Sequence, residues 1–498
     1  MKLNSDEYKD KVYACWAGKN LGGTMGGPYE GCRNTLDVKG FATKPKEALP
    51  NDDLDLQLVW LHAVEFEGPR NITAEVLGEY WLSFITGCWN EYGIAKRNME
   101  KGIIPPLCGD SQNPWKHSNG AWIRTEIWAT LAPAYPDLAV RFAIEDAKVD
   151  HGMGEGTYAA AFVAALESAA FVVSDGRKLI DIGLSKIPDG CRIAQSVRLV
   201  ISCFDKGLSW LETRNAILEL NKDIGDGWFQ APSNVAFVVL DLLFGNGDFK
   251  KSMLTAINCG DDTDCTGGTV GAILGIMYGK KGLPNDWLEY MGDEIVTGAI
   301  NTCLSMPRVK NCSELTDKVA ALAPSVLLFN RMNAQSVDIY TGRTEFSDEE
   351  IGKMSFPYGK CEETDGMRAS LFSMRPDTFS MKLAYATAIV SYLDGTEIRP
   401  NEERKISLRI VNNVKAFGNL PNTVRVKVRL PNGFSADAEE FDVFAPHWTP
   451  FTLDCTSEER IITIKAGEKI DAVNEILLEV GAVGRYTKAY MPVIFSAK

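Results

Sequence analysis

The chain has 498 residues, of which 45% are hydrophobic and 10% aromatic, so it is long enough for two or three folded domains. Its formal net charge of −14 argues against nucleic acid or an anionic membrane surface as the main partner. The N-terminus MKLNSDEYKD has no apolar signal core, no apolar run could span a bilayer and the cysteines form no Cys-x-x-Cys pairs, so we expect a cytoplasmic protein with reduced thiols.

The first part of the chain, up to about residue 330, has a helical texture of Ala- and Leu-rich stretches broken by Gly and Pro. Near its start, a helix is expected to run from Tyr13 into a Gly-rich loop at Gly22–Gly27, followed by Glu30. Backbone amides in such a loop can form an anion nest, although most Gly-rich loops are flexible turns. From the residues alone, the flexible turn is the preferred interpretation.

The segment LPNDDLDLQLVWLHAVEFEG, residues 49–68, predicts the start of a helix. Asn51 is a good N-cap, and Asp52 and Asp53 fall in the first turn, before an apolar stripe. Carboxylates at this position complement the helix dipole. For this segment alone, that structural role is the preferred interpretation.

Two further segments, Thr157–Val173 and Pro232–Phe244, are apolar on most faces. Helices without a polar face are usually buried among other elements. We therefore predict that both form central helices of a bundle.

The segment NCGDDTDCTGGTVGAILGIMYG, residues 258–279, combines three carboxylates with a run of glycines. Gly260 can end the preceding helix, which leaves the carboxylates of Asp261, Asp262 and Asp264 in a short turn. Small residues recur at helical spacing behind the turn, so another helix is expected to approach this one closely. The sequence thus places an acidic turn at the end of a tightly packed helix.

Three carboxylates within four residues are more than a helix cap needs. Ligand sets made only of oxygen favour a hard cation, so Mg²⁺ or Mn²⁺ is expected before zinc. The spacing is not that of an EF-hand loop. A metal site and a solvated acidic turn are about equally good interpretations of this segment by itself.

After about Met332 the pattern changes to an alternation of apolar and polar residues, at 406–410, 424–428 and 462–464. Turn-forming sequences such as PNG and AGE separate these runs, which predicts an antiparallel β-sandwich. We therefore predict an α + β multidomain protein, with a helical domain over residues 1–330 and a β-sandwich over residues 335–498.

The two acidic segments together resemble the paired signature of the ADP-ribosylglycohydrolase family. The resemblance is carried by NDDLD at 51–55 and GDDTDCTGGTVGAILGIMYG at 260–279. YACWAGKNLGGTMGGPYEG at 13–31 and VDHGMGEGTYAAAFVAA at 149–165 support it. It extends over roughly residues 8–300 and leaves the β region uncovered.

The resemblance implies an all-α orthogonal helical bundle that holds two Mg²⁺ ions, or Mn²⁺ in their place, between the two acidic loops. Glu30 and Asp53 would be the catalytic carboxylates, with Glu30 placed to activate water or to hold the ribose hydroxyls. Gly26, Gly27 and His151 would contact the substrate. The metal ligands implied by the match are Asn51, Asp52, Asp53, Asp262 and Asp264.

The sequence departs from the family pattern at three positions. Asn51 and Leu54 stand where the first motif usually has hydroxyl residues, and Cys265 replaces the hydroxyl residue of the second. An amide oxygen can still bind a hard cation, whereas a thiol is a poor ligand for Mg²⁺. These changes therefore bear on the second of the two metal sites.

We expect a metal-dependent hydrolase that cleaves the glycosidic bond of an ADP-ribosyl or related N- or O-ribosyl compound, either a small molecule or protein-linked. The alternative is a non-catalytic protein that binds ADP-ribose or a nucleotide and has lost turnover. Leu54 and Cys265 favour the binding protein, while the intact carboxylate set favours the enzyme.

Overall fold

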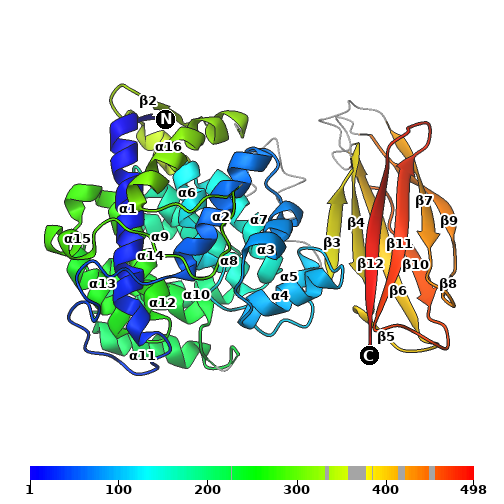
Figure 1. The fold of residues 1–498 in the computed structure, drawn as a ribbon, viewed down its shortest axis with the longest axis horizontal. Coiled ribbons are helices and arrows are strands. Elements are labelled where there is room, and N and C mark those ends of the chain that lie inside the picture. The colour runs from blue at the N-terminus through cyan, green and yellow to red at the C-terminus, as the bar shows by residue number, and fades with distance from the viewer. Residues whose placement is uncertain are drawn as a thin grey trace. The chain divides into compact units, whose positions relative to one another are not determined.

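The computed structural model describes residues 1–225, 227–304, 306–330, 336–356, 377–383, 385–412, 421–447 and 455–498. The chain divides into two compact units (Figure 1). One comprises Met1–Ile94 and Asn113–Glu363, and the other comprises Ala95–Gln112 and Thr364–Lys498. The first is mostly helical and the second carries the two five-stranded sheets, which confirms the predicted α + β multidomain class. The predicted domain boundary at residues 331–335 lies outside the described residues.

The helical part of the chain contains the following helices: α1 (Ser5–Gly26), α2 (Asp52–Glu67), α3 (Ala74–Phe84), α4 (Asn90–Glu100), α5 (Leu107–Asp110), α6 (Glu126–Leu131), α7 (Pro136–Asp150), α8 (Glu155–Ala169), α9 (Gly176–Leu184), α10 (Arg192–Asp205), α11 (Trp210–Asn221), α12 (Ala231–Phe244), α13 (Phe249–Asn258), α14 (Thr263–Tyr278), α15 (Asn285–Met291), α16 (Cys312–Phe329) and α17 (Asp348–Lys353). Strand β1 (Lys2–Asn4) pairs in parallel with β2 (Asp338–Tyr340). The two predicted central helices are α8 and α12, and most of their residues are buried. No helix in the described ranges is both long and apolar enough to cross a membrane.

Glycines bring the backbones of α1 and α14 together. A Cβ atom added to Gly22 would lie 2.2 Å from the backbone of Gly267, and one added to Gly275 would lie 2.2 Å from the carbonyl oxygen of Ala14. Only glycine fits at these crossings, because a Cβ atom there would overlap the backbone of the partner helix. The predicted close approach of a second helix to α14 is therefore confirmed, and the second helix is α1.

The predicted Gly-rich loop at Gly22–Gly27 was wrong. Helix α1 continues to Gly26, and a short 3₁₀ helix, Gly27–Tyr29, follows it directly. The amide of Gly27 donates to the carbonyl of Gly23. Packing against α14 outweighs the intrinsic helix penalty of glycine, which is about 1 kcal/mol for each residue. The backbone amides are used inside the helix and form no anion nest.

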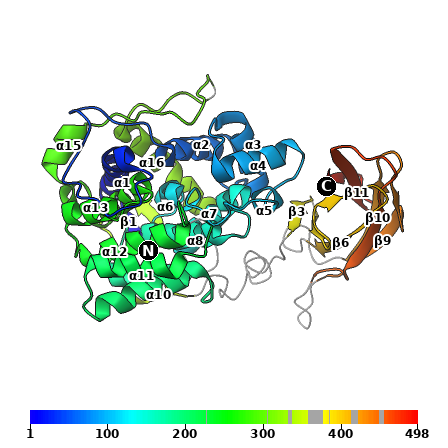
Figure 2. The same cartoon turned by 90° about the horizontal axis from the view of Figure 1, so that it is seen from below.

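The second unit is a β-sandwich of two five-stranded sheets, with strand orders β3-β4-β6-β10-β8 and β5-β12-β11-β7-β9. Figure 2 views the strands nearly end-on. The neighbouring pairs are antiparallel except β5–β12, so the predicted sandwich is confirmed. The strands are β3 (Thr378–Lys382), β4 (Ala386–Tyr392), β5 (Glu397–Ile398), β6 (Glu403–Asn412), β7 (Asn422–Arg429), β8 (Ser435–Ala436), β9 (Glu440–Ala445), β10 (Arg460–Lys465), β11 (Val473–Ala482) and β12 (Lys488–Ala497).

The sandwich core follows from the alternation in the sequence. Ile406, Leu408 and Ile410 of β6 are fully buried, as are their counterparts on the facing sheet. The Tyr392 hydroxyl on β4 donates to the carbonyl of Ile494 on β12, at 3.1 Å, and so links the two sheets. The apolar face of each strand therefore forms the interior of the sandwich.

Candidate active site

The two acidic segments converge because the elements that carry them are tied together. Asn51 caps α2, with its Oδ1 accepting the amide of Asp53 at 2.8 Å. The residue after Glu30, Gly31, donates its amide to the carbonyl of Asp261 at 2.9 Å, and Asp261 donates its own amide to Cys32 at 2.7 Å. These bonds hold the segment carrying Glu30 against the turn that precedes α14.

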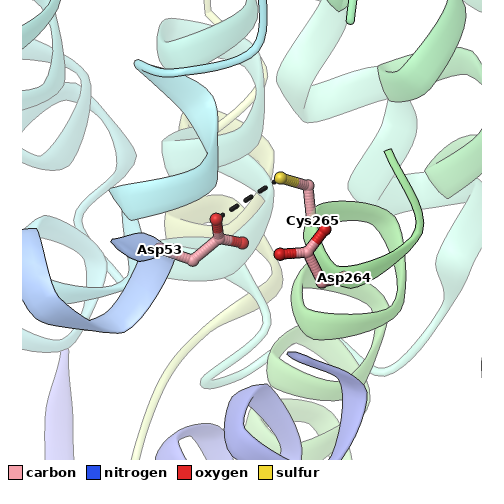
Figure 3. A group of neighbouring side chains, drawn as sticks. All are labelled: Asp53, Asp264 and Cys265. Atoms are coloured by element: carbon pink, nitrogen blue, oxygen red, sulfur yellow. Dashed lines mark hydrogen bonds between the residues drawn. The ribbon is translucent and has the colours of Figure 1, made fainter. Parts of the chain in front are cut away.

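The carboxylates form two overlapping groups. In the first group, oxygen atoms of Glu30, Asp262 and Asp264 lie within 4.8 Å of one another. In the second, ligand atoms of Asp53, Asp264 and Cys265 lie within the same distance (Figure 3). The structure therefore brings together acids from α2, from α14 and from the segment after α1, as the sequence pattern required.

Burial and mutual repulsion raise the pKa values of these acids. Burial, followed by the charges of Glu30 and Asp52, raises the pKa of Asp264 to about 7. Burial and Asp53 raise the pKa of Asp52 to about 7, and burial with Asp52 and Asp53 does the same for Glu30. A nearby cation stabilises the ionised form of such buried and closely spaced carboxylates.

One oxygen of this group lacks a protein partner. Among the described residues, Oδ1 of Asp264 is buried and accepts no hydrogen bond, and the residue is 7% exposed. A buried carboxylate oxygen without a donor is costly unless a cation or water binds it. The all-oxygen set of Glu30, Asp262 and Asp264 therefore fits a hard divalent cation such as Mg²⁺ or Mn²⁺.

Two neutral side chains orient the acids, and sequence reasoning missed both. Asn119 donates from Nδ2 to Oδ2 of Asp262 at 2.6 Å, and the Tyr92 hydroxyl donates to Oδ2 of Asp52 at 3.1 Å. Both come from segments far from either acidic loop, and nothing in their local sequence marks them. They fix which carboxylate oxygens remain free for a ligand.

Asp261, the first acid of the second motif, has a structural role. Its Oδ1 accepts the amide of Phe229 at 3.1 Å, and its Oδ2 accepts from Nδ2 of Asn234 at 3.0 Å. Its φ of 69° belongs to the left-handed region, which aspartate tolerates better than most residues. Asp261 thus shapes the turn, while Asp262 and Asp264 point their carboxylates toward the other acids.

Lys19 is a further residue of the site that was not predicted from the sequence. It is 1% exposed on α1, with Nζ 3.2 Å from Oδ2 of Asp53 and 2.8 Å from Oε1 of Glu126. Its signal was a single lysine in the otherwise uncharged stretch VYACWAGKNLGGTMGG, residues 12–27. An isolated charge among apolar and glycine residues of a buried helix indicates a buried partner.

His151 does not lie at an open surface of the site, where a substrate contact was expected. It is fully buried, with Nδ1 2.9 Å from Oδ1 of Asp150 and Nε2 3.3 Å from Oγ of Ser118. Arg124 pairs with Asp150 at 2.9 Å. The ring therefore lies inside a buried polar network, and its predicted contact with substrate stays a prediction.

The remaining predicted residues lie at the edges of the site. Gly26 packs against the start of α14, where a Cβ would lie 2.2 Å from the carbonyl of Thr263, and Gly27 is half-buried beside it. Asn51 uses its side-chain oxygen as a helix cap. The roles of these residues in substrate and metal binding remain predictions.

Comparison with known proteins agrees with the sequence pattern. The profile of the family described as ADP-ribosylglycohydrolase matches residues 4–321. The solved structure of an ADP-ribosylglycohydrolase-related protein complex is 20% identical, with a TM-score of 0.42, over 64% of this chain and 98% of that chain. A FixG-related protein from Vibrio parahaemolyticus is 13% identical, with a TM-score of 0.18, over 23% of this chain and 99% of that chain. No curated protein matches. The matched range contains every acid of the candidate site.

Proposed function

Since the chain belongs to the ADP-ribosylglycohydrolase family, we propose that it is a metal-dependent hydrolase of an ADP-ribosyl or related N- or O-ribosyl glycosidic bond. The substrate would be a small molecule or a protein-linked group, and the cofactor would be Mg²⁺ or Mn²⁺. The observation that carries this proposal is the convergence of Glu30, Asp262 and Asp264, with one buried Asp264 oxygen left without a donor.

The proposed reaction breaks the glycosidic bond at the ribose anomeric carbon through an electron-poor transition state. A bound divalent ion supplies an acidified water and a point of attachment for ribose hydroxyls. Asp262 and Asp264 would hold that ion, and Asn119 keeps the Asp262 carboxylate in place. The protein's part is to fix these oxygens before the substrate arrives.

Glu30 is suited to the proton transfer. Its side chain is exposed, whereas Asp262 and Asp264 are buried. Without a metal, partial burial and the charges of Asp52 and Asp53 raise the pKa of Glu30 to about 7. A bound cation would favour its ionised form. An ionised carboxylate beside a metal site and open to solvent can accept a proton from an attacking water.

A second candidate function is supported by Asp53. Its carboxylate contacts Lys19 and accepts a hydrogen bond from the Cys265 thiol at 3.3 Å. A site that lacks part of its metal set could retain the fold and bind ADP-ribose or a nucleotide without turnover. The enzyme remains the preferred interpretation because oxygen atoms of Glu30, Asp262 and Asp264 lie close together.

The test is an assay for free ADP-ribose with model substrates that differ in their N- or O-linked leaving group. Purified protein is assayed with Mg²⁺, with Mn²⁺ and with a chelator, and Asp262→Asn serves as the inactive control. Metal-dependent release that the variant lacks supports the hydrolase. Binding of ADP-ribose by calorimetry without release of product from any substrate supports the binding protein instead.

A further inference from the structure

The ammonium group of Lys19 is surrounded by oxygen acceptors. Besides its two carboxylate partners, Nζ donates to the carbonyl of Ile123 at 2.6 Å and lies 3.3 Å from Oγ1 of Thr269. Gly268 leaves room for the lysine stem, because a Cβ there would lie 3.1 Å from Cδ of Lys19. The buried ammonium group is thus held between two carboxylates and two neutral oxygen acceptors. It provides a fixed positive charge beside Asp53.

The partner of this charge is one of the acids that the family resemblance assigns to the metals. Both oxygens of Asp53 are engaged, Oδ2 with Lys19 and Oδ1 with the thiol of Cys265 (Figure 3). Oδ1 of Asp264, by contrast, has no protein donor in the described part of the chain. The two overlapping groups of ligands thus differ in their ability to bind a metal ion. The group with Asp53 already contacts the ammonium group of Lys19, whereas no lysine or arginine among the described residues pairs with Glu30, Asp262 or Asp264.

A divalent ion at Asp53 would share that carboxylate with an ammonium group, and like charges repel strongly in a buried site. It would also face a thiol where an oxygen ligand is needed, and thiols are poor ligands for Mg²⁺ and Mn²⁺. Both the ammonium group of Lys19 and the thiol of Cys265 contact Asp53, and both disfavour a second ion there.

We propose that Lys19 takes the place of a second metal ion, so that this protein binds one divalent cation, at Asp262 and Asp264 beside Glu30. The proposal rests on the proposed function in taking these acids as the metal site. In this protein Lys19 is then a positioning residue, because it holds the Asp53 carboxylate at the edge of a mononuclear centre.

The test is a count of bound ions in the full chain. Mn²⁺ is titrated into metal-free protein by calorimetry, and the loaded protein is examined by electron paramagnetic resonance. We expect one Mn²⁺ for each chain and the signal of an isolated ion. Two ions with an exchange-coupled signal would overturn the proposal but leave metal dependence intact. No binding would overturn both this proposal and the metal-dependent function.

Two variants separate the lysine from the thiol. Cys265→Thr restores a hydroxyl but keeps Lys19, so we expect it still to bind one ion, and two ions would show that the thiol alone excludes the second. Lys19→Met combined with Cys265→Thr should bind two ions. A folded double variant that still binds one ion would contradict the role of Lys19. Lys11→Met is the matched control. Lys11 lies on the same helix but donates to the carbonyl of Phe171 instead of contacting an acid of the metal site, so this variant should bind one ion.

Discussion

Gly18 of α1 lies directly against Gly271 of α14, so closely that a Cβ atom added to Gly18 would sit 2.1 Å from the carbonyl oxygen of Gly271. Helix α1 leads to Glu30, and α14 carries Asp264 in its first turn. The contact between two residues without side chains therefore sets the spacing between two parts of the candidate active site.

The first prediction follows from this contact. Gly18→Ala forces a methyl group into a backbone atom, and overpacking of this kind costs about 1–3 kcal/mol. We expect a fall in melting temperature of at least about 2 °C, measured by calorimetry. Gly352→Ala in α17 is the control, because nothing lies within 4 Å of the added Cβ, and it should not lower the melting temperature. Equal effects of the two changes would contradict the close crossing.

The second prediction concerns metal binding and pH. Mn²⁺ at about one hundred times its Kd should stabilise the protein by about 2.7 kcal/mol. The pKa values of Asp52 and Asp264 are raised to about 7, so protons compete with the metal at pH 6 and much less at pH 8. The Mn²⁺-induced rise in melting temperature should therefore be larger at pH 8.

Asp264→Asn should remove most of that rise, while Asp286→Asn, at an exposed acid that pairs with Lys250, should leave it unchanged. A full metal effect in Asp264→Asn would place the ion elsewhere.

The locally encoded parts of the fold were predicted well from the sequence. The N-cap at Asn51, the helix end near Gly260 and the strands around 406–410 and 424–428 all depend on local signals, and the structure confirms them. Cap residues, turn residues and alternation are encoded within a few neighbouring positions.

Long-range partnerships could not be predicted in this way. The segment Gly22–Gly27 was predicted to be a loop because the glycines on α14 that stabilise its helical part, up to Gly26, lie far along the chain. The identity of the acids that pair with Lys19 could not be predicted for the same reason, since Asp53 and Glu126 belong to α2 and α6. Contacts of this kind depend on the packing of the whole bundle.

The third prediction tests Glu30 as the group that accepts a proton. Glu30→Gln removes the basic carboxylate and keeps an oxygen beside the metal acids. Hydrolysis should slow by about a hundredfold or more, which is the usual size of a general-base effect. The variant should still bind one Mn²⁺ for each chain by calorimetry. Turnover close to that of the unmodified protein would rule out Glu30 as the base.

The fourth prediction uses a buried acid outside the site. Asp241 on α12 is fully buried, and neither carboxylate oxygen has a hydrogen-bond partner among the described residues. Burial raises the pKa of Asp241 well above its usual value, so the folded protein retains a proton that the unfolded chain loses above about pH 4. The folded state is therefore penalised increasingly as the pH rises from 4 toward the raised pKa.

Asp241→Asn cannot ionise and escapes this penalty. Its melting temperature relative to the unmodified protein should increase between pH 4 and pH 8, as followed by differential scanning fluorimetry. A difference that stays constant over this range would mean that Asp241 is not held protonated in the folded state.

The most direct test of the account is a crystal structure of the protein soaked with Mn²⁺ and ADP-ribose, read from the anomalous difference map. We predict one manganese peak bound by Asp262 and Asp264, with the ribose of ADP-ribose beside it and its anomeric carbon facing Glu30. A map with no manganese at these acids, or with ADP-ribose bound away from them, would contradict the assignment of this site as the place where the glycosidic bond is cleaved.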